Sequence, residues 1–170
     1  MAHHLQLFVG HPEVLRRYVD LSPRVQLYRL TPAAELAVAL IDDEIQDALH
    51  KIYGTGEWLD ALRLTTSDMA FAAETSLRGP LAYLETDYAA GEGRQAAATW
   101  AGGALSLRPV AMAVDQGLGR PAATWPINGA LRALGVIAQP GRDAFETFGL
   151  DLYRTFEDVT SGALPVRMGR

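Results

Sequence analysis

Residues 81–100 read LAYLETDYAAGEGRQAAATW, and this stretch decides the expected fold. Its two halves, Leu81–Tyr88 and Arg94–Trp100, have compositions that fit β-strands. The glycine-containing segment between them, Ala90–Gly93, is typical of a tight turn. We therefore expect an antiparallel β-hairpin at the centre of the molecule.

Further strands and helices are expected on both sides of this hairpin. Apolar runs predict strands at Leu5–Val9, Val25–Leu30, Leu36–Ile41 and Ala104–Leu107. Helical spacing and capping residues predict helices from Pro12, Ser67, Pro126 and Asp143, a helix capped by Asp42 or Asp43, and a short helical piece at Glu57–Leu62. The stretch Ser67–Arg78 also fits a strand by alternation, but its alanines and the Gly-Pro stop that follows favour a helix. Residues 109–121 are expected to form an irregular loop.

These elements predict an α+β fold: a single globular domain over residues 1–170, mainly an antiparallel sheet with packed helices. The length of 170 residues suits one domain. A composition of 49% hydrophobic and 21% charged residues is that of a protein with a real core. Residues 163–170 are expected to form a frayed tail.

Composition also excludes several functional classes. The chain has no cysteine, which rules out disulfides, thiol nucleophiles and iron–sulfur clusters. A net charge of −5 with scattered basic residues argues against nucleic acid or an anionic membrane as a partner. The start lacks a signal-peptide pattern, and no window approaches the ~18 apolar residues of a membrane span. We therefore expect a cytoplasmic protein. The single lysine and the 16 glycines resemble the amino-acid usage of bacteria with GC-rich genomes.

The hairpin contains a pattern that resembles a nucleotide-binding loop. Residues Gly91–Ala96 match G-x-G-x-x-A, which needs a buried apolar strand before it and a long helix after it. Glu85 and Asp87 interrupt that strand, and Gly102–Gly103 leaves no room for the helix. We interpret the pattern as a hairpin turn. The sequence also lacks a nucleophile elbow, a P-loop and an H-E-x-x-H pair, so we expect no cofactor.

An acidic strand face is the best-placed polar cluster. Glu85 and Asp87 lie two residues apart, so on a strand they share a face with Tyr83. Paired carboxylates can perform acid–base chemistry or bind a ligand. The simpler interpretation is a half-exposed strand that ends at a solvated turn, with Arg94 as counter-charge. The alanines at 96–98 leave space above the sheet for either a close helix or a ligand.

Two other groups of residues allow a functional or a structural interpretation. Asp43, Asp47 and His50 share a helix face that fits a metal site but fits a solvated surface better, so we expect no metal. Trp125 precedes Pro126 at a helix start. It can pack as a hydrophobic staple or serve as an exposed anchor for a protein partner.

The later half of the chain carries a resemblance. Residues 79–88 and 91–100, together with the helix at 126–136, resemble segments of small uncharacterised bacterial proteins. No catalytic residue follows from that resemblance. The size and acidity are similar to those of bacterial immunity proteins, which implies a protein that acts by binding another protein.

The expected function is therefore non-catalytic: a protein-binding or regulatory domain, immunity-like, whose partner is another protein of basic character. The alternative is a small enzyme or ligand-binding protein with a pocket over the 81–100 hairpin, lined by Tyr83, Glu85, Asp87 and Arg94. A third expectation is self-association as a homodimer, because strand edges often pair between copies.

Overall fold

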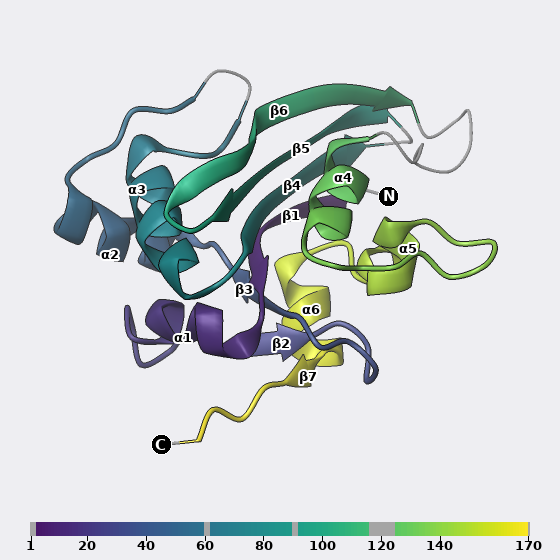
Figure 1. Ribbon diagram of the computed structural model, residues 1–170, viewed down its shortest axis with the longest axis horizontal. Helices are drawn as coiled ribbons and strands as arrows, with labels where there is room; N and C mark the ends of the chain where they lie inside the picture. Colours follow the sequence, from purple (N-terminus) through teal and green to yellow (C-terminus); the bar gives the residue numbers. More distant parts are fainter. Residues whose placement is uncertain (1–2, 60–61, 90–91, 116–124, 170) are drawn as a thin grey trace.

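The structure is a computed structural model that describes residues 3–59, 62–89, 92–115 and 125–169 (Figure 1). Within these ranges seven strands form one sheet in the order β6-β5-β4-β1-β3-β2-β7, and the paired neighbours are antiparallel. The strands are β1 (His3–Gly10), β2 (Leu27–Arg29), β3 (Ala37–Leu40), β4 (Leu81–Ala89), β5 (Glu92–Ala101), β6 (Ala104–Asp115) and β7 (Leu164–Pro165). The expected antiparallel α+β fold is confirmed.

The predicted hairpin is confirmed as β4 and β5, with Leu81 opposite Trp100 and Ala89 opposite Glu92. Gly93 needs to be glycine, because its φ is 157° and a Cβ there would overlap the backbone of Asp87 and Tyr88. Of the predicted turn, residues 90 and 91 lie outside the described residues. The G-x-G-x-x-A pattern therefore leads into a strand instead of a helix.

Two layers of helices cover the sheet (Figure 1). One layer holds α1 (Pro12–Val19), α2 (Asp43–Tyr53) and α3 (Thr66–Thr75), which continues into η1 (Ser76–Arg78). The other holds α4 (Pro126–Ala133), α5 (Ala144–Phe148), η3 (Leu150–Leu152) and α6 (Phe156–Gly162). Tyr83 packs in the core beneath the first layer and Leu84 in the core beneath the second. We call these sides the Tyr83 face and the Leu84 face.

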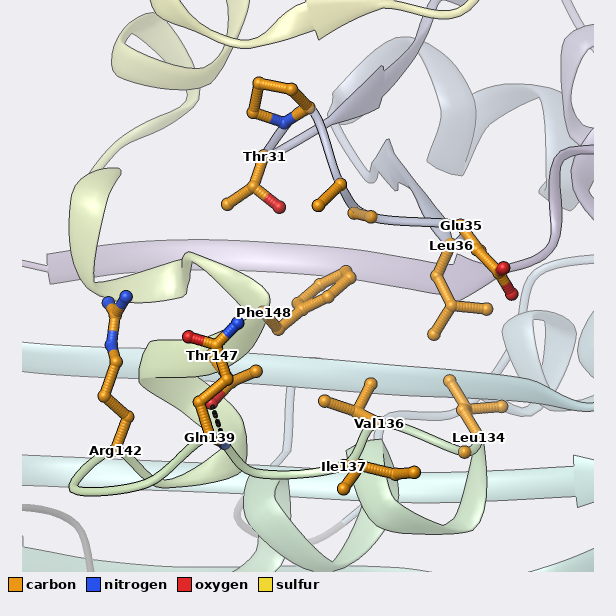
Figure 2. A pocket seen from close by; sticks show the side chains of 14 residues that line it. Thr31, Glu35, Leu36, Leu134, Val136, Ile137, Gln139, Arg142, Thr147 and Phe148 are labelled. Atoms are coloured by element: carbon orange, nitrogen blue, oxygen red, sulfur yellow. Dashed lines mark hydrogen bonds between the residues drawn. The ribbon is translucent and has the colours of Figure 1, made fainter.

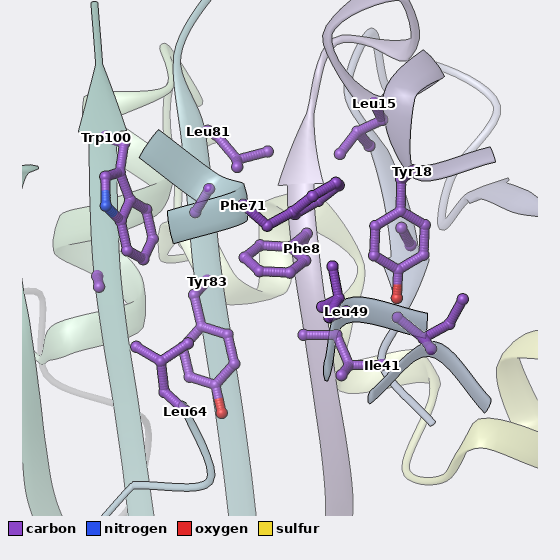
Figure 3. Close-up of a cluster of buried hydrophobic side chains, with 14 of the residues drawn as sticks. Phe8, Leu15, Tyr18, Ile41, Leu49, Leu64, Phe71, Leu81, Tyr83 and Trp100 are labelled. Carbon is purple, nitrogen blue, oxygen red and sulfur yellow. The ribbon is translucent and has the colours of Figure 1, made fainter. Parts of the chain in front are cut away.

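Aromatic rings fill the core of the Tyr83 face (Figure 3). The Phe8 ring centroid lies 5.9 Å from that of Tyr18, 5.9 Å from that of Phe71 and 6.0 Å from that of Tyr83. The rings meet edge-on or tilted, the arrangements that favour aromatic contacts. Trp100 is 1% exposed in the same core. The antiparallel sheet is thus buried on both faces.

Several predicted elements are confirmed with shifted boundaries. The segment Ser67–Arg78 is helical, but its N-cap is Thr65, which forms a capping box with Asp68. Asp42 caps α2 and Asp143 caps α5. The glycine pair after β5 adopts φ values of 59° and 84°, which a two-residue hairpin turn requires. None of the helices within the described ranges is both long and apolar enough to span a bilayer.

Two predicted elements are wrong in the described residues. Residues 109–115 belong to strand β6 and not to a loop, because Val110, Ala111 and Met112 pair with β5; residues 116–121 lie outside the described residues. Pro109 fits there because β6 is an edge strand with an irregular register near Thr99. The segment 57–59 is not helical, since Trp58 forms a bridge with Thr65.

The expected frayed tail also differs in part. Leu164 and Pro165 pair with Arg29 and Tyr28 as β7, and the amide of Val166 donates to the carbonyl of Leu27. A two-residue strand has almost no pattern by which sequence alone can reveal it.

Candidate functional site

The acidic end of β4 is closed rather than open. Glu85 is 1% exposed, although the sequence suggested a half-exposed strand. Its Oε2 accepts hydrogen bonds from the backbone N–H of Arg63 at 2.8 Å and from the Tyr83 hydroxyl at 2.8 Å. Its Oε1 accepts from the Arg94 guanidinium at 3.2 Å. Both carboxylate oxygens are therefore engaged, which is what allows this charge to be buried.

The residue that closes the cluster is Arg63, whose role sequence reasoning missed. Its guanidinium donates to Asp87 Oδ2 at 3.1 Å and contacts the His4 ring, while its carbonyl accepts from the Gln6 amide at 2.6 Å. Asp87 stays about two-fifths exposed, with a side-chain exposure of 41%. The interpretation as a half-exposed strand thus holds for Asp87 and is wrong for Glu85. No local pattern marks Arg63, because its contacts lie 22 to 59 residues away in the chain.

Tyr83 is held neutral in this cluster. Burial, and next the nearby Glu85 carboxylate, raise the pKa of the Tyr83 hydroxyl well above its ordinary value. The hydroxyl consequently serves as a hydrogen-bond donor to Glu85. The structure brings Tyr83, Glu85, Asp87 and Arg94 together. Glu85 and Asp87 bind Arg63, and these contacts attach the segment 62–65 to the sheet. We call this set of contacts the brace.

The alanines of β5 pack against protein on both sides. Ala96 and Ala98 share the Tyr83-face core with Leu64, while Ala97 shares the Leu84-face core with Ile127. Of the two options left open by the sequence, close packing of α4 is the one observed on the Leu84 face. A chain segment, Leu62–Leu64, occupies the space on the Tyr83 face.

An open pocket lies elsewhere, on the Leu84 face. It has a volume of about 630 Å³ and is bordered by the segments Thr31–Leu36 and Leu134–Gln139 (Figure 2). The side chains of Leu36, Leu134 and Val136 line it together with the buried ring of Phe148. We call it the 31–36/134–139 pocket. Sequence reasoning did not single out any residue of it as functional.

Polar groups of this pocket lie at its rim. The Arg142 guanidinium donates to Asp151 at 3.3 Å, so its charge is balanced within the protein. The Thr147 hydroxyl accepts from the backbone N–H of Gln139 at 3.0 Å, as the dashed line in Figure 2 indicates. Glu35 is exposed and, within the described ranges, has neither an ion-pair nor a hydrogen-bond partner. The rim therefore carries one uncompensated negative charge.

The structure places Trp125 at the N-cap of α4, where it is partly buried. A hydrophobic staple requires the residue before the N-cap, so the staple prediction is wrong by one position. The start of α4 is fixed instead by Gln95, whose side-chain oxygen accepts from the Ile127 amide at 3.0 Å. Trp125 as a partner anchor stays a prediction.

The described residues form no group of three His, Asp or Glu side chains that is suited to hold a metal ion. The pattern Asp43, Asp47 and His50 therefore makes no such group in this part of the chain. The Nε2 atom of His50 is buried and lacks a hydrogen-bond partner among the described residues.

Comparison with known proteins adds no assignment to this geometry. The resemblance of the later half to small bacterial proteins therefore stays a prediction. No family model, curated protein or solved structure matches this chain.

Proposed function

We propose that this protein is a non-catalytic binding protein, and that its 31–36/134–139 pocket receives an apolar segment of another protein that carries a basic residue. The observation that carries the proposal is the open apolar pocket itself, with Ile137 at its border 85% exposed. Large apolar side chains grouped around a hollow are typical of interaction sites. Its volume of about 630 Å³ falls in the range of pockets that bind ligands.

The rim charges favour a basic partner. Among the described residues Glu35 lacks an ion-pair partner, whereas Arg142 is balanced by Asp151. The net charge of −5 over the whole chain acts in the same direction and raises the association rate of a cationic partner. Because the pocket is open rather than enclosed by the protein, a protruding segment can enter it without a conformational change.

Catalysis at the hairpin is the competing proposal, and the geometry supports it less well. A general base needs an oxygen that is free to accept a proton from a substrate. The Oε2 of Glu85 already accepts two hydrogen bonds and its Oε1 accepts one. Substrate access would require Arg63 to leave, which would expose a buried carboxylate and cost the bonds that balance it.

The test is a titration of isotope-labelled protein with short peptides, followed by amide chemical shifts. The probes are the capped tripeptide Leu-Ile-Arg and its charge-reversed counterpart Leu-Ile-Glu, each up to about 5 mM, a range that detects weak binding. We expect shifts confined to residues 31–36 and 134–148, with the arginine peptide binding about two to five times more tightly.

Two variants make the result specific. Glu35→Gln should remove the preference for the arginine peptide while leaving the residual binding of both peptides. Ile137→Ser should weaken the binding of both peptides, whereas Leu152→Ser, at another exposed apolar side chain (60% exposed), should weaken neither. Shifts confined to residues 62–65 and 83–94, or no localised shifts with either peptide, would overturn the proposal.

A further inference from the structure

The sheet ends in two very different edges. At one end, β7 has two residues, Leu164 and Pro165. At the other, β6 runs for 12 residues, Ala104–Asp115, and pairs with β5 along one side only. Within the described ranges no strand covers its outer side. A long uncovered edge presents a row of backbone donors and acceptors that can pair with another strand.

The side chains of β6 do little to protect this edge. Leu105 is 39% exposed, Val110 38% and Met112 38%. Leu105 lies opposite Trp100 on the Tyr83 face, and Val110 lies opposite Ala97 on the Leu84 face. Arg108 is the only charged residue between positions 104 and 113. Proteins protect such edges with charges, prolines and bulges, and between positions 104 and 113 β6 carries one charge, Pro109 and a register shift near Thr99, so residues 110–113 are its least protected part.

A hollow follows the same edge on the Tyr83 face. It has a volume of about 590 Å³ and is formed by β6, α3 and the segment that precedes α3. The lining residues are Leu59, Leu62, Met69, Leu105, Arg108 and Pro109. A strand added beside β6 would therefore find apolar room for its side chains next to its backbone partners.

We propose that β6 pairs antiparallel with β6 of a second copy of this chain, about a two-fold axis, so that two sheets join into one. A second copy fits because an antiparallel pair of identical strands has two-fold symmetry, and each contact then occurs twice. Growth stops at two copies, because the edges left over are the two short β7 strands with Pro165.

The size of the contact sets its strength. A strand of 12 residues is about 40 Å long, and a strip about 10 Å deep covers on the order of 400 Å² of each protomer. Stable interfaces bury about 800 Å² of each partner. Side chains that enter the hollow supply part of the difference, and Pro109 removes one backbone donor from each strand. The dimer should therefore dissociate on dilution.

Sedimentation velocity at concentrations from about 1 µM to about 500 µM tests this, because mass action shifts such an equilibrium. We expect a monomer at the low end and a dimer at the high end. Hydrogen exchange should slow, as concentration rises, at those N–H groups of residues 104–113 that point away from β5. A monomer at every concentration would overturn the proposal.

Variants locate the interface. Met112→Lys together with Val110→Lys should raise the dissociation constant at least about tenfold, because like charges then meet across the two-fold axis. Ile137→Lys, at the 31–36/134–139 pocket, should leave it unchanged, which separates this proposal from the proposed function. If Ile137→Lys abolished the dimer and the double variant did not, the β6 proposal would be contradicted. Circular dichroism confirms folding, and if the double variant unfolds, Met112→Lys alone gives the same comparison.

Discussion

The acidic cluster on β4 and the 31–36/134–139 pocket lie on opposite faces of one sheet, and one is filled whereas the other is open. Glu85 is buried with a partner for each oxygen, supplied in part by Arg63. In the pocket, by contrast, Glu35 has no partner among the residues that the structure describes, and Ile137 is 85% exposed. A conspicuous polar pattern in a sequence can thus serve stability, while an inconspicuous apolar loop provides the binding surface.

The largest effect is expected at the filled site. Glu85→Gln should lower the free energy of unfolding by about 2–3 kcal/mol, because the amide places a donor against the donors of Arg63, Tyr83 or Arg94. Urea unfolding measures this loss. The control is Glu92→Gln on the exposed part of the same hairpin, expected to change stability by less than about 0.5 kcal/mol. Equal losses in the two variants would show that the cluster is not a brace.

Enlarging an alanine should also affect stability differently in the filled region and at the open pocket. Ala98→Leu should cost about 1–3 kcal/mol, because Ala98 is fully buried in the Tyr83-face core. Ala33→Leu enlarges an exposed alanine at the open pocket, so its effect on thermal unfolding should stay within about 0.5 kcal/mol. If Ala98→Leu is tolerated as well as Ala33→Leu, the space above β5 is not filled as described.

Arg63→Ala distinguishes the backbone of the closing segment from its side chain. The variant keeps the hydrogen bond from the backbone N–H of residue 63 to Glu85. It removes the ion pair between Arg63 and Asp87, whose two side chains are 38% and 41% exposed, respectively. We expect a loss of about 0.5–1 kcal/mol that shrinks in high salt. Urea unfolding at two salt concentrations checks it. A salt-independent loss as large as that of Glu85→Gln would place the brace in the guanidinium instead.

The smallest effect concerns pH and the adjacent histidines of β1. His3 points to the Leu84 face, accepts from Thr86 through Nδ1 and donates through Nε2 to the Leu150 carbonyl. Burial lowers the pKa of His3 below 6.5. The unfolded chain then binds more protons between those two pKa values, so stability should fall as pH falls below about 6.5.

A histidine-resolved NMR titration measures the His3 midpoint directly, and urea unfolding at several pH values measures the linked stability. The variant His3→Phe retains a ring beside Tyr88 and Phe145 and should lose this part of the pH dependence. A midpoint for His3 at or above 6.5 would contradict the assigned burial.

Local sequence signals predicted elements well where a complete local pattern was present. The β4–β5 hairpin and the Asp42 cap of α2 follow from contacts within a few residues. The full length of β6 could not be predicted in this way. Pro109 and a register shift interrupt its local pattern, and only pairing with β5 continues the strand past them. The four candidate residues of the hairpin were found, but Arg63 was not, since it reaches Glu85 from 22 residues away.

The sequence by itself determined the class of fold, the central hairpin and the absence of cysteine chemistry, because these depend on residue type and short-range spacing. Tertiary structure alone decided whether the acidic face was open or closed. Burial of a charge depends on which distant groups arrive to bond it, and here Arg63 arrives at Glu85. It also decided where a pocket stays open, because the segment 31–36 between β2 and β3 and the segment 134–139 after α4 are distant in the sequence and meet only in the folded protein.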